Sequence, residues 1–305
     1  MKDKPLVSII INCYNSERYL KETIDSVISQ TYDNWEIIFW DNQSTDSSAE
    51  IIKSYHDHRI RYFLAQNHTT LGEGRNLALK KLKGDFFKFL DADDVIYPSH
   101  LENLLPLFSD KDVGIVYSNS HIYDQTKDKF IVNDRRHRDS GDVFLSWVSN
   151  YNVLLPSVIV RSSCLNSLNE WFDVRFSMVE EFDFLLRISY QNKVSYSCEV
   201  LSFWRRYPES LSFKKSNRWE IEFSLLIEKL KYNYIQEKDF NKISSINYRL
   251  AYLKFVNKIM IEEKVERRII RPSIFRSKKL LLAFVLSFSG LALTRKAIMF
   301  MRRLF

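Results

Sequence analysis

Two patterns of apolar residues alternate along the chain from residue 5 to about residue 120. Short continuous runs rich in Val, Ile and Phe, such as LVSIII at 6–11, are typical of strands buried on both faces. Between them, apolar side chains recur every three or four residues, which is the spacing of an amphipathic helix. We predict strands at residues 6–11, 36–40, 60–64, 86–90 and 113–117. We predict helices at residues 16–30, 45–55, 74–82 and 98–108, the first with Ser16 as its N-cap.

Strands that alternate with helices predict an α/β fold, with a parallel sheet covered by helices on both faces. The pattern becomes mixed between residues 118 and 215, where we expect strands at 154–160 and 200–205 and a helix at 179–190. Residues 216–271 are predicted to form two or three helices. We therefore divide the chain into an α/β domain over 1–215, a helical extension over 216–271 and a tail over 272–305.

Composition excludes several classes of protein. Of the 305 residues, 45% are hydrophobic and 27% are charged, so the chain can bury a full core and is not a disordered tail. Its three cysteines are far apart and show no metal-ligand spacing, which argues against a disulfide framework or a zinc site. A reducing cytosol fits this cysteine usage best.

The net charge of +7 is concentrated at the C-terminal end. Between residues 264 and 305, eleven Lys and Arg stand against one acid, Glu266. The uncharged apolar stretch at 280–293 is shorter than the roughly 20 residues of a membrane span. With basic residues on both sides it is typical of a helix that lies on an anionic membrane surface, although it could instead pack on the rest of the protein. No nucleic-acid-binding module is recognisable.

The strongest local signal is Asp91-Ala92-Asp93-Asp94, which directly follows the predicted strand FFKFL. Ligands of open parallel sheets bind beyond the carboxyl ends of the strands. Carboxylates crowded there repel one another unless a cation neutralises them, and oxygen ligands select Mg²⁺ or Mn²⁺. Asp91 and Asp93 therefore form a candidate metal–diphosphate site, with a solvated acidic turn as the alternative.

Two further polar clusters follow predicted strands. Asp41 ends the strand EIIFW, and Asn12-Cys13-Tyr14-Asn15 follows the first strand. An aspartate at a strand tip can accept hydrogen bonds from a base or a ribose. The alternative is that Ser44 or Thr45 caps the next helix. Phosphate-loop motifs are missing, since GEGRN at 72–76 is not a dinucleotide fingerprint and no Walker A sequence is present.

These motifs, in this order and spacing, resemble glycosyltransferase family 2. The resemblance covers residues 5–120 closely and continues weakly to about residue 213. It implies a GT-A fold, with a Rossmann-like nucleotide-binding sheet, a mixed region on the acceptor side and, in this chain, the C-terminal helical extension. It also implies that Asn12, Tyr14, Asn15 and Asp41 lie around the nucleotide base. The family's Asp-Asp-Gly-Ser is Asp41-Asn42-Gln43-Ser44 here, so the second carboxylate is lost.

The resemblance assigns the remaining donor contacts to residues near the diphosphate. Arg75 matches the arginine of the family's Ala-Arg-Asn segment. Asp93 would ligate Mn²⁺ or Mg²⁺, and Asp91 would hold the ribose or a metal-bound water. Arg205 is a candidate for balancing the diphosphate charge, with a structural ion pair as an equal alternative. Tyr207 replaces a family histidine, so we expect no imidazole at the metal.

The family's catalytic base lies in a Glu-Asp pair that opens a helix, and the matching segment here is EEFDFLLR at 180–187. Glu181 takes the position of the aspartate. An acceptor hydroxyl needs a positioned base to accept its proton as the oxygen attacks the anomeric carbon. A neighbouring carboxylate or burial would raise the pKa of such a base. Glu180 and Asp183 are the alternative bases. The non-catalytic alternative is that these acids form an ordinary acidic first turn of the helix.

The resemblance implies an inverting, metal-dependent glycosyltransferase that uses a nucleotide sugar, with a UDP-sugar favoured. The acceptor would be a saccharide or a polyprenyl-diphosphate-linked sugar in bacterial surface-polysaccharide synthesis, such as O-antigen or capsule. We expect a cytoplasmic protein, peripheral on the inner face of the plasma membrane, without a nucleic-acid partner. The competing hypotheses are an inactive sugar- or nucleotide-binding scaffold and, less favoured, a nucleotidyltransferase. A processive synthase would need several membrane spans, which the sequence lacks.

Overall fold

The computed structural model describes residues 4–133, 139–210, 218–235, 251–252, 254–255 and 283. By its contacts the chain divides into two units, one of residues 1–144 and 152–210 and the other of residues 145–151 and 211–305. The first unit carries the sheet, and the second contains α8 (Trp219–Asn233). The predicted tail and most of the predicted helical extension lie outside the described residues. The proposed domain boundaries stay a prediction.

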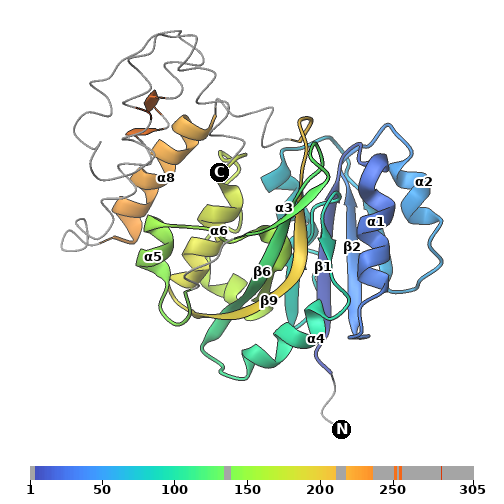
Figure 1. The fold of residues 1–305 in the computed structure, drawn as a ribbon, viewed down its shortest axis with the longest axis horizontal. Coiled ribbons are helices and arrows are strands. Elements are labelled where there is room, and N and C mark those ends of the chain that lie inside the picture. Colours follow the sequence, from blue (N-terminus) through green and yellow to red (C-terminus); the bar gives the residue numbers. More distant parts are fainter. Residues whose placement is uncertain are drawn as a thin grey trace. The chain divides into compact units, whose positions relative to one another are not determined.

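The first half of the sheet is parallel, as predicted. Its strands lie in the order β3-β2-β1-β4, and their bounds are β1 (Val7–Cys13), β2 (Trp35–Asp41), β3 (Ile60–Leu64) and β4 (Phe86–Phe89). Three helices connect them: α1 (Glu17–Ile28), α2 (Ser48–Lys53) and α3 (Leu71–Leu79). Helices α1 and α2 pack together, and α3 packs on β1 and β2 (Figure 1).

Burial explains the continuous apolar runs of these strands. Val7, Ile9 and Ile11 of β1 join one hydrophobic cluster that includes residues of α1 and α2. The intervening Ile10 is equally buried but lies outside that cluster, so its side chain faces the other side of the sheet. A parallel sheet covered on both faces requires such runs.

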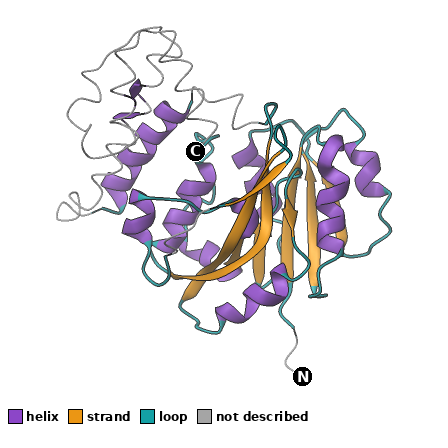
Figure 2. Cartoon of the chain, viewed as in Figure 1, coloured by secondary structure: helices purple, strands orange, loops and turns teal. Residues whose placement is uncertain are grey.

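The second half of the sheet is mixed. Here β8 (Val158–Arg161) lies antiparallel between β4 and β6 (Val113–Asp124), and β9 (Lys193–Arg206) runs parallel to β6. Two short strands, β5 (Val95–Ile96) on β9 and β7 (Lys129–Val132) on β6, were not predicted. Strands β6 and β9 are much longer than the predicted 113–117 and 200–205. Their outer parts pair with each other (Figure 2), a long-range contact that local sequence does not reveal.

Prolines divide two of the predicted elements. The helix expected at 98–108 is α4 (His100–Leu104) followed by a 3-10 turn (Leu105–Phe108) that contains Pro106. The strand expected at 154–160 begins as a 3-10 turn (Leu155–Ser157) around Pro156 before β8. Proline has no N–H to donate, so it fits the first turn of a short helix but not the interior of a helix or strand.

Capping contacts can be compared with the predicted helix starts. Ser16 is the N-cap residue of α1, as predicted, but its side chain makes no capping hydrogen bond, and it is the Ser16 carbonyl that accepts from the N–H groups of Tyr19 and Leu20. Helix α3 begins three residues before the predicted 74–82 because Thr70 and Glu73 form a reciprocal capping box. The predicted helix at 179–190 is confirmed as α6 (Glu180–Ser189). A further 3-10 turn (Ser162–Ser167) follows β8, and α5 (Phe144–Ser149) precedes the Leu155 turn.

Candidate active site

The loops after β1 and β2 bring the predicted base-binding residues to one edge of the sheet. Cys13 and Asp41, the last residues of the two strands, are neighbours in parallel register. Asn15 has a left-handed backbone, with φ of 52°, and its Oδ1 accepts a hydrogen bond from the Thr45 N–H at 2.7 Å. The two loops are therefore tied together directly.

Asp41 is buried and its carboxylate is fully engaged. Its Oδ1 accepts from the Ser44 N–H at 2.8 Å, and its Oδ2 accepts from the Tyr62 hydroxyl at 2.8 Å. Ser44 and Thr45 do not cap α2, whose N-cap is Ser47. These contacts give Asp41 a structural part in the loop, and its contact with a nucleotide base stays a prediction.

Tyr14 and Asn12 present groups that a ligand could use. The Tyr14 side chain is half exposed, and its ring lies 4.3 Å from the ring of His68. The Oδ1 atom of Asn12 is buried and has no hydrogen-bond partner in the part of the chain that the structure describes. The Asn12 amide nitrogen lies only 3.0 Å from where a Cβ on Gly74 would stand, so a side chain at position 74 would displace it.

Arg75 links the loop after β4, which carries Asp91, to helix α6. Its guanidinium is 1% exposed and donates to Asp91 Oδ1 at 2.8 Å and to Glu180 Oε1 at 3.1 Å. The capping box of α3 fixes the start of the helix that carries Arg75. This residue thus joins two other sequence-predicted site residues, Asp91 and Glu180, that lie far apart in the chain.

The carboxylates after β4 are short of positive charge. The Oδ2 of Asp93 accepts a hydrogen bond from the Tyr207 hydroxyl at 2.7 Å. Burial, and then the negative charge of Asp91, raises the pKa of Asp93 to about 6. A divalent cation beside the two carboxylates would remove this repulsion, so Asp91 and Asp93 fit Mn²⁺ or Mg²⁺. Among the described residues there is no cluster of three or more His, Cys, Asp or Glu suited to a metal. The pair suits an ion that also takes diphosphate oxygens.

Arg205 stabilises this loop through hydrogen bonds to Asp93 and Asp94. Its backbone N–H donates to Asp94 Oδ1 at 2.9 Å, its Nε donates to the Asp93 carbonyl at 2.8 Å, and its Nη2 donates to Glu22 Oε2 at 2.5 Å. These contacts match the structural ion pair that the sequence left open. A contact of Arg205 with diphosphate stays a prediction.

The sequence analysis gave no role to two ionisable residues next to this loop, Asp94 of the acidic motif and Lys88 of β4. Asp94 is fully buried, and burial together with the charges of Asp93 and Asp91 raises its pKa well above the usual range. Lys88 of β4 is also buried, its Nζ donates to the Pro156 carbonyl at 2.8 Å, and burial lowers its pKa to about 7. The available signal was a single lysine within an otherwise apolar strand.

Helix α6 separates the three candidate bases by their surroundings. Glu180 pairs with Arg75, and Asp183 pairs with Arg187 at 2.8 Å. Glu181 makes no hydrogen bond or ion pair with the described part of the chain. Burial, and then the charge of Glu180, raises the pKa of Glu181 to about 8, against the opposing effect of Arg75. Of the three acids, Glu181 is therefore the one without an arginine partner among the described residues.

Comparison with known proteins decides the family. The model of the family described as "Glycosyl transferase family 2" matches residues 8–163, more than half of the chain. The chain belongs to glycosyltransferase family 2. This confirms the resemblance derived from the sequence motifs.

Relatives and solved structures agree with this membership. An uncharacterised glycosyltransferase of Rickettsia typhi is 34% identical over 208 residues, covering 65% of this chain and 63% of the relative. The chain thus spans less than two thirds of that relative's length. Residues 1–349 of Staphylococcus aureus TarS, solved with UDP-GlcNAc, match with a TM-score of 0.65 at 17% identity, covering 97% of this chain and 91% of that fragment.

A second solved structure matches equally broadly. The mannosyltransferase PcManGT of Pyrobaculum calidifontis, solved with GDP-Man and Mn²⁺, matches with a TM-score of 0.63 at 14% identity. The match covers 96% of this chain and 86% of the PcManGT chain. The two likenesses confirm the expected GT-A fold. None of the described helices is long and apolar enough to cross a membrane.

Proposed function

We propose that this family 2 member transfers a sugar, with inversion, from a UDP-sugar to a saccharide or a polyprenyl-diphosphate-linked acceptor. The observation that carries the proposal is the position and chemistry of Glu181. It follows Glu180, which the buried Arg75 connects to Asp91 at the candidate donor site. An unpaired carboxylate with a raised pKa beside a donor site suits a general base.

The catalytic role of Glu181 is to accept the proton of the acceptor hydroxyl. A pKa of about 8 makes this carboxylate a better proton acceptor than a free glutamate. Glu180 and Asp183 serve the proposal as supports, since each already pairs with an arginine. Arg75 hydrogen-bonds to both Asp91 and Glu180, so it connects the donor side of the site to the helix that carries the base.

Asp93 and Asp91 are the residues that would hold Mn²⁺ or Mg²⁺. The cation would supply charge stabilisation for the departing nucleoside diphosphate. The Tyr207 hydroxyl donates to Asp93 Oδ2 and orients this carboxylate. Asn12, Tyr14 and Asn15 would surround the base, with the unpartnered Asn12 Oδ1 as an acceptor for its N–H.

Two features of the relatives favour this donor and cation. TarS was solved with UDP-GlcNAc, and PcManGT was solved with GDP-Man and Mn²⁺. A bacterial surface polysaccharide, such as O-antigen or capsule, is the proposed destination of the sugar. The basic segment at 264–305 favours a cytoplasmic protein bound to the inner face of the plasma membrane.

A thermal-shift screen tests the proposal most directly. Purified protein is heated with UDP, GDP, CMP or dTDP, each with and without Mn²⁺, because a ligand of the folded state raises the Tm. A shift that one diphosphate produces only with the metal supports the donor site and selects the nucleotide for sugar-transfer assays. No shift with any of them, from folded protein, would favour the inactive scaffold instead.

A further inference from the structure

Three of the arginines around the candidate site already have acidic partners. Arg75, Arg205 and Arg206 pair with Asp91, Glu22 and Asp124, respectively. Arg18 is different, since it makes no ion pair with any described residue. Its guanidinium is therefore available to an anionic ligand.

A chain of aromatic contacts runs from Arg18 to Asp93, the proposed metal ligand. Arg18 lies in the first turn of α1, and its guanidinium carbon is 5.0 Å from the centroid of the Tyr19 ring. The Tyr19 ring is in turn 5.1 Å from the ring of Tyr207, whose hydroxyl donates to Asp93. Two ring contacts and one hydrogen bond thus connect the Arg18 guanidinium to Asp93.

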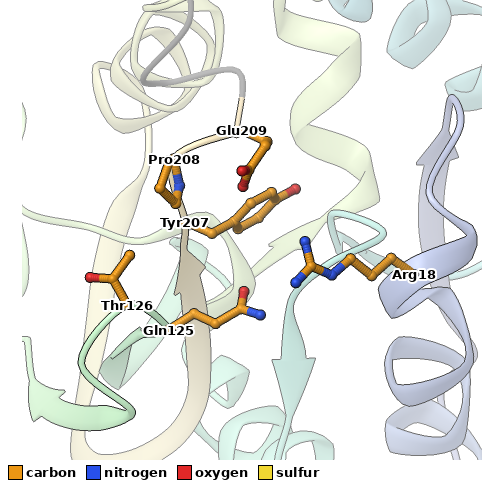
Figure 3. A pocket seen from close by; sticks show the side chains of 6 residues that line it. All are labelled: Arg18, Gln125, Thr126, Tyr207, Pro208 and Glu209. Carbon is orange, nitrogen blue, oxygen red and sulfur yellow. The ribbon is translucent and has the colours of Figure 1, made fainter.

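A cavity of about 230 Å³ lies between these groups. Its lining residues are Arg18, Gln125, Thr126, Tyr207, Pro208 and Glu209. Figure 3 shows Arg18 extending from α1 towards Tyr207. Gln125 is held in the lining because its Oε1 accepts a hydrogen bond from the Tyr19 hydroxyl at 2.6 Å. The cavity is therefore built from α1, the β6–β7 turn and the segment after β9.

We propose that Arg18 binds the diphosphate of the donor in this cavity, an inference that rests on the proposed function. Arg18 follows the proposed base-binding loop at 12–15 by three residues, and Tyr207, which lines the same cavity, donates its hydroxyl hydrogen bond to Asp93. The diphosphate joins the base-carrying nucleoside to the sugar, so it must span this interval. A guanidinium also matches the fork of phosphate oxygens.

The chemistry of transfer gives Arg18 its function. The acceptor oxygen forms a bond to the anomeric carbon, and its proton passes to Glu181. The bond from the anomeric carbon to the diphosphate oxygen breaks, and its electron pair stays on that oxygen. Arg18 stabilises the negative charge that the diphosphate gains, which is a larger charge in the transition state than in the bound donor.

Substitution of Glu209 should change UDP affinity in the opposite direction to substitution of Arg18. Its carboxylate lines the same cavity and repels an anion there. Arg18→Ala should weaken UDP binding in Mn²⁺ by about 10- to 100-fold, the loss of a charge-assisted contact. Glu209→Gln should strengthen UDP binding a few-fold. Binding of uridine, which has no phosphate, should be unchanged in both variants.

The measurements are isothermal titration calorimetry for UDP and ligand-detected NMR for the weaker uridine. Lys21→Ala is the matched control, since Lys21 lies one turn further along α1, is exposed and pairs with Asp25. Arg18→Lys, which keeps the charge but loses the fork, should fall between the wild type and Arg18→Ala.

The outcomes separate the inference from the proposed function. If the wild type binds neither UDP nor another nucleoside diphosphate, the proposed function itself fails. If the wild type binds UDP and Arg18→Ala binds it equally well, only the role of Arg18 is overturned. Loss of acceptor-sugar affinity in both Arg18→Ala and Glu209→Gln, with UDP binding intact, would instead make the cavity a saccharide site.

Discussion

The two strand-tip regions of the candidate site differ in how their acids are satisfied. After β2, the carboxylate of Asp41 accepts hydrogen bonds on both oxygens, from a backbone N–H and from the Tyr62 hydroxyl. After β4 and at the start of α6, Asp93, Asp94 and Glu181 all have raised pKa values, because burial and like charges disfavour ionisation. The Asp41 carboxylate is satisfied without a ligand, whereas the second region has an excess of negative charge.

This contrast indicates a division of labour. A loop whose hydrogen bonds are complete can hold a fixed shape, as recognition of a flat base requires. A cluster of uncompensated carboxylates favours binding of a cation and proton transfer, because both processes remove negative charge. Substitutions after β2 should therefore lower stability, whereas substitutions after β4 and in α6 should lower metal binding or catalysis.

The largest effect is expected from Glu181→Gln. Removing the general base should lower kcat by about 10²- to 10⁴-fold and leave donor affinity nearly unchanged. Steady-state kinetics, with UDP affinity measured separately, checks this. Glu228→Gln, an exposed glutamate of α8, is the control. Full activity of Glu181→Gln would mean that another acid is the base.

Asp93→Asn should weaken the binding of the cation. We expect the gain in UDP affinity that Mn²⁺ provides to fall by about 10- to 100-fold, because a metal ligand is lost. Calorimetric titration of UDP with Mn²⁺ and with EDTA measures this gain. The stability of the metal-free protein should be unchanged or higher, since a repelled carboxylate is removed. Asp142→Asn, an exposed site, should behave as the wild type. An undiminished metal effect would contradict the assignment of Asp93.

Asp41→Asn tests the opposite region. The asparagine cannot reproduce both accepted hydrogen bonds of a buried carboxylate, so unfolding free energy should fall by about 1–3 kcal/mol. Chemical denaturation of the metal-free protein measures the change, again with Asp142→Asn as the reference. An Asp41→Asn variant as stable as the wild type would remove the contrast between the two regions.

The smallest effect concerns pH. The pKa of Glu181 is raised from 4.5 to about 8 on folding, so the folded state favours its protonated form. The stability from this group is fully present below pH 4.5 and is lost as pH rises through 8. The wild-type Tm should therefore fall a few degrees more between pH 5 and pH 9 than that of Glu181→Gln. Parallel melting curves would show that folding does not raise this pKa.

Local sequence patterns predicted much of the parallel half of the sheet. The continuous apolar runs and the 3–4 spacing are properties of neighbouring residues, so β1 to β4 and α1 to α3 could be placed. The long pairing of β6 with β9, and the short strands β5 and β7, depend on contacts between distant segments. No local pattern encodes such pairing, so the mixed half was predicted only in part.

The sequence by itself determined the family and the chemical kinds of the site residues, because motif order and residue type are properties of the chain. The tertiary structure decided which of these residues are paired. Arg75 reaches Glu180, Arg205 reaches Glu22, and Tyr207 reaches Asp93 across 105, 183 and 114 residues of sequence. Such pairings, which leave Arg18 and Glu181 without an ion pair among the described residues, arise only when the sheet brings distant strand ends together.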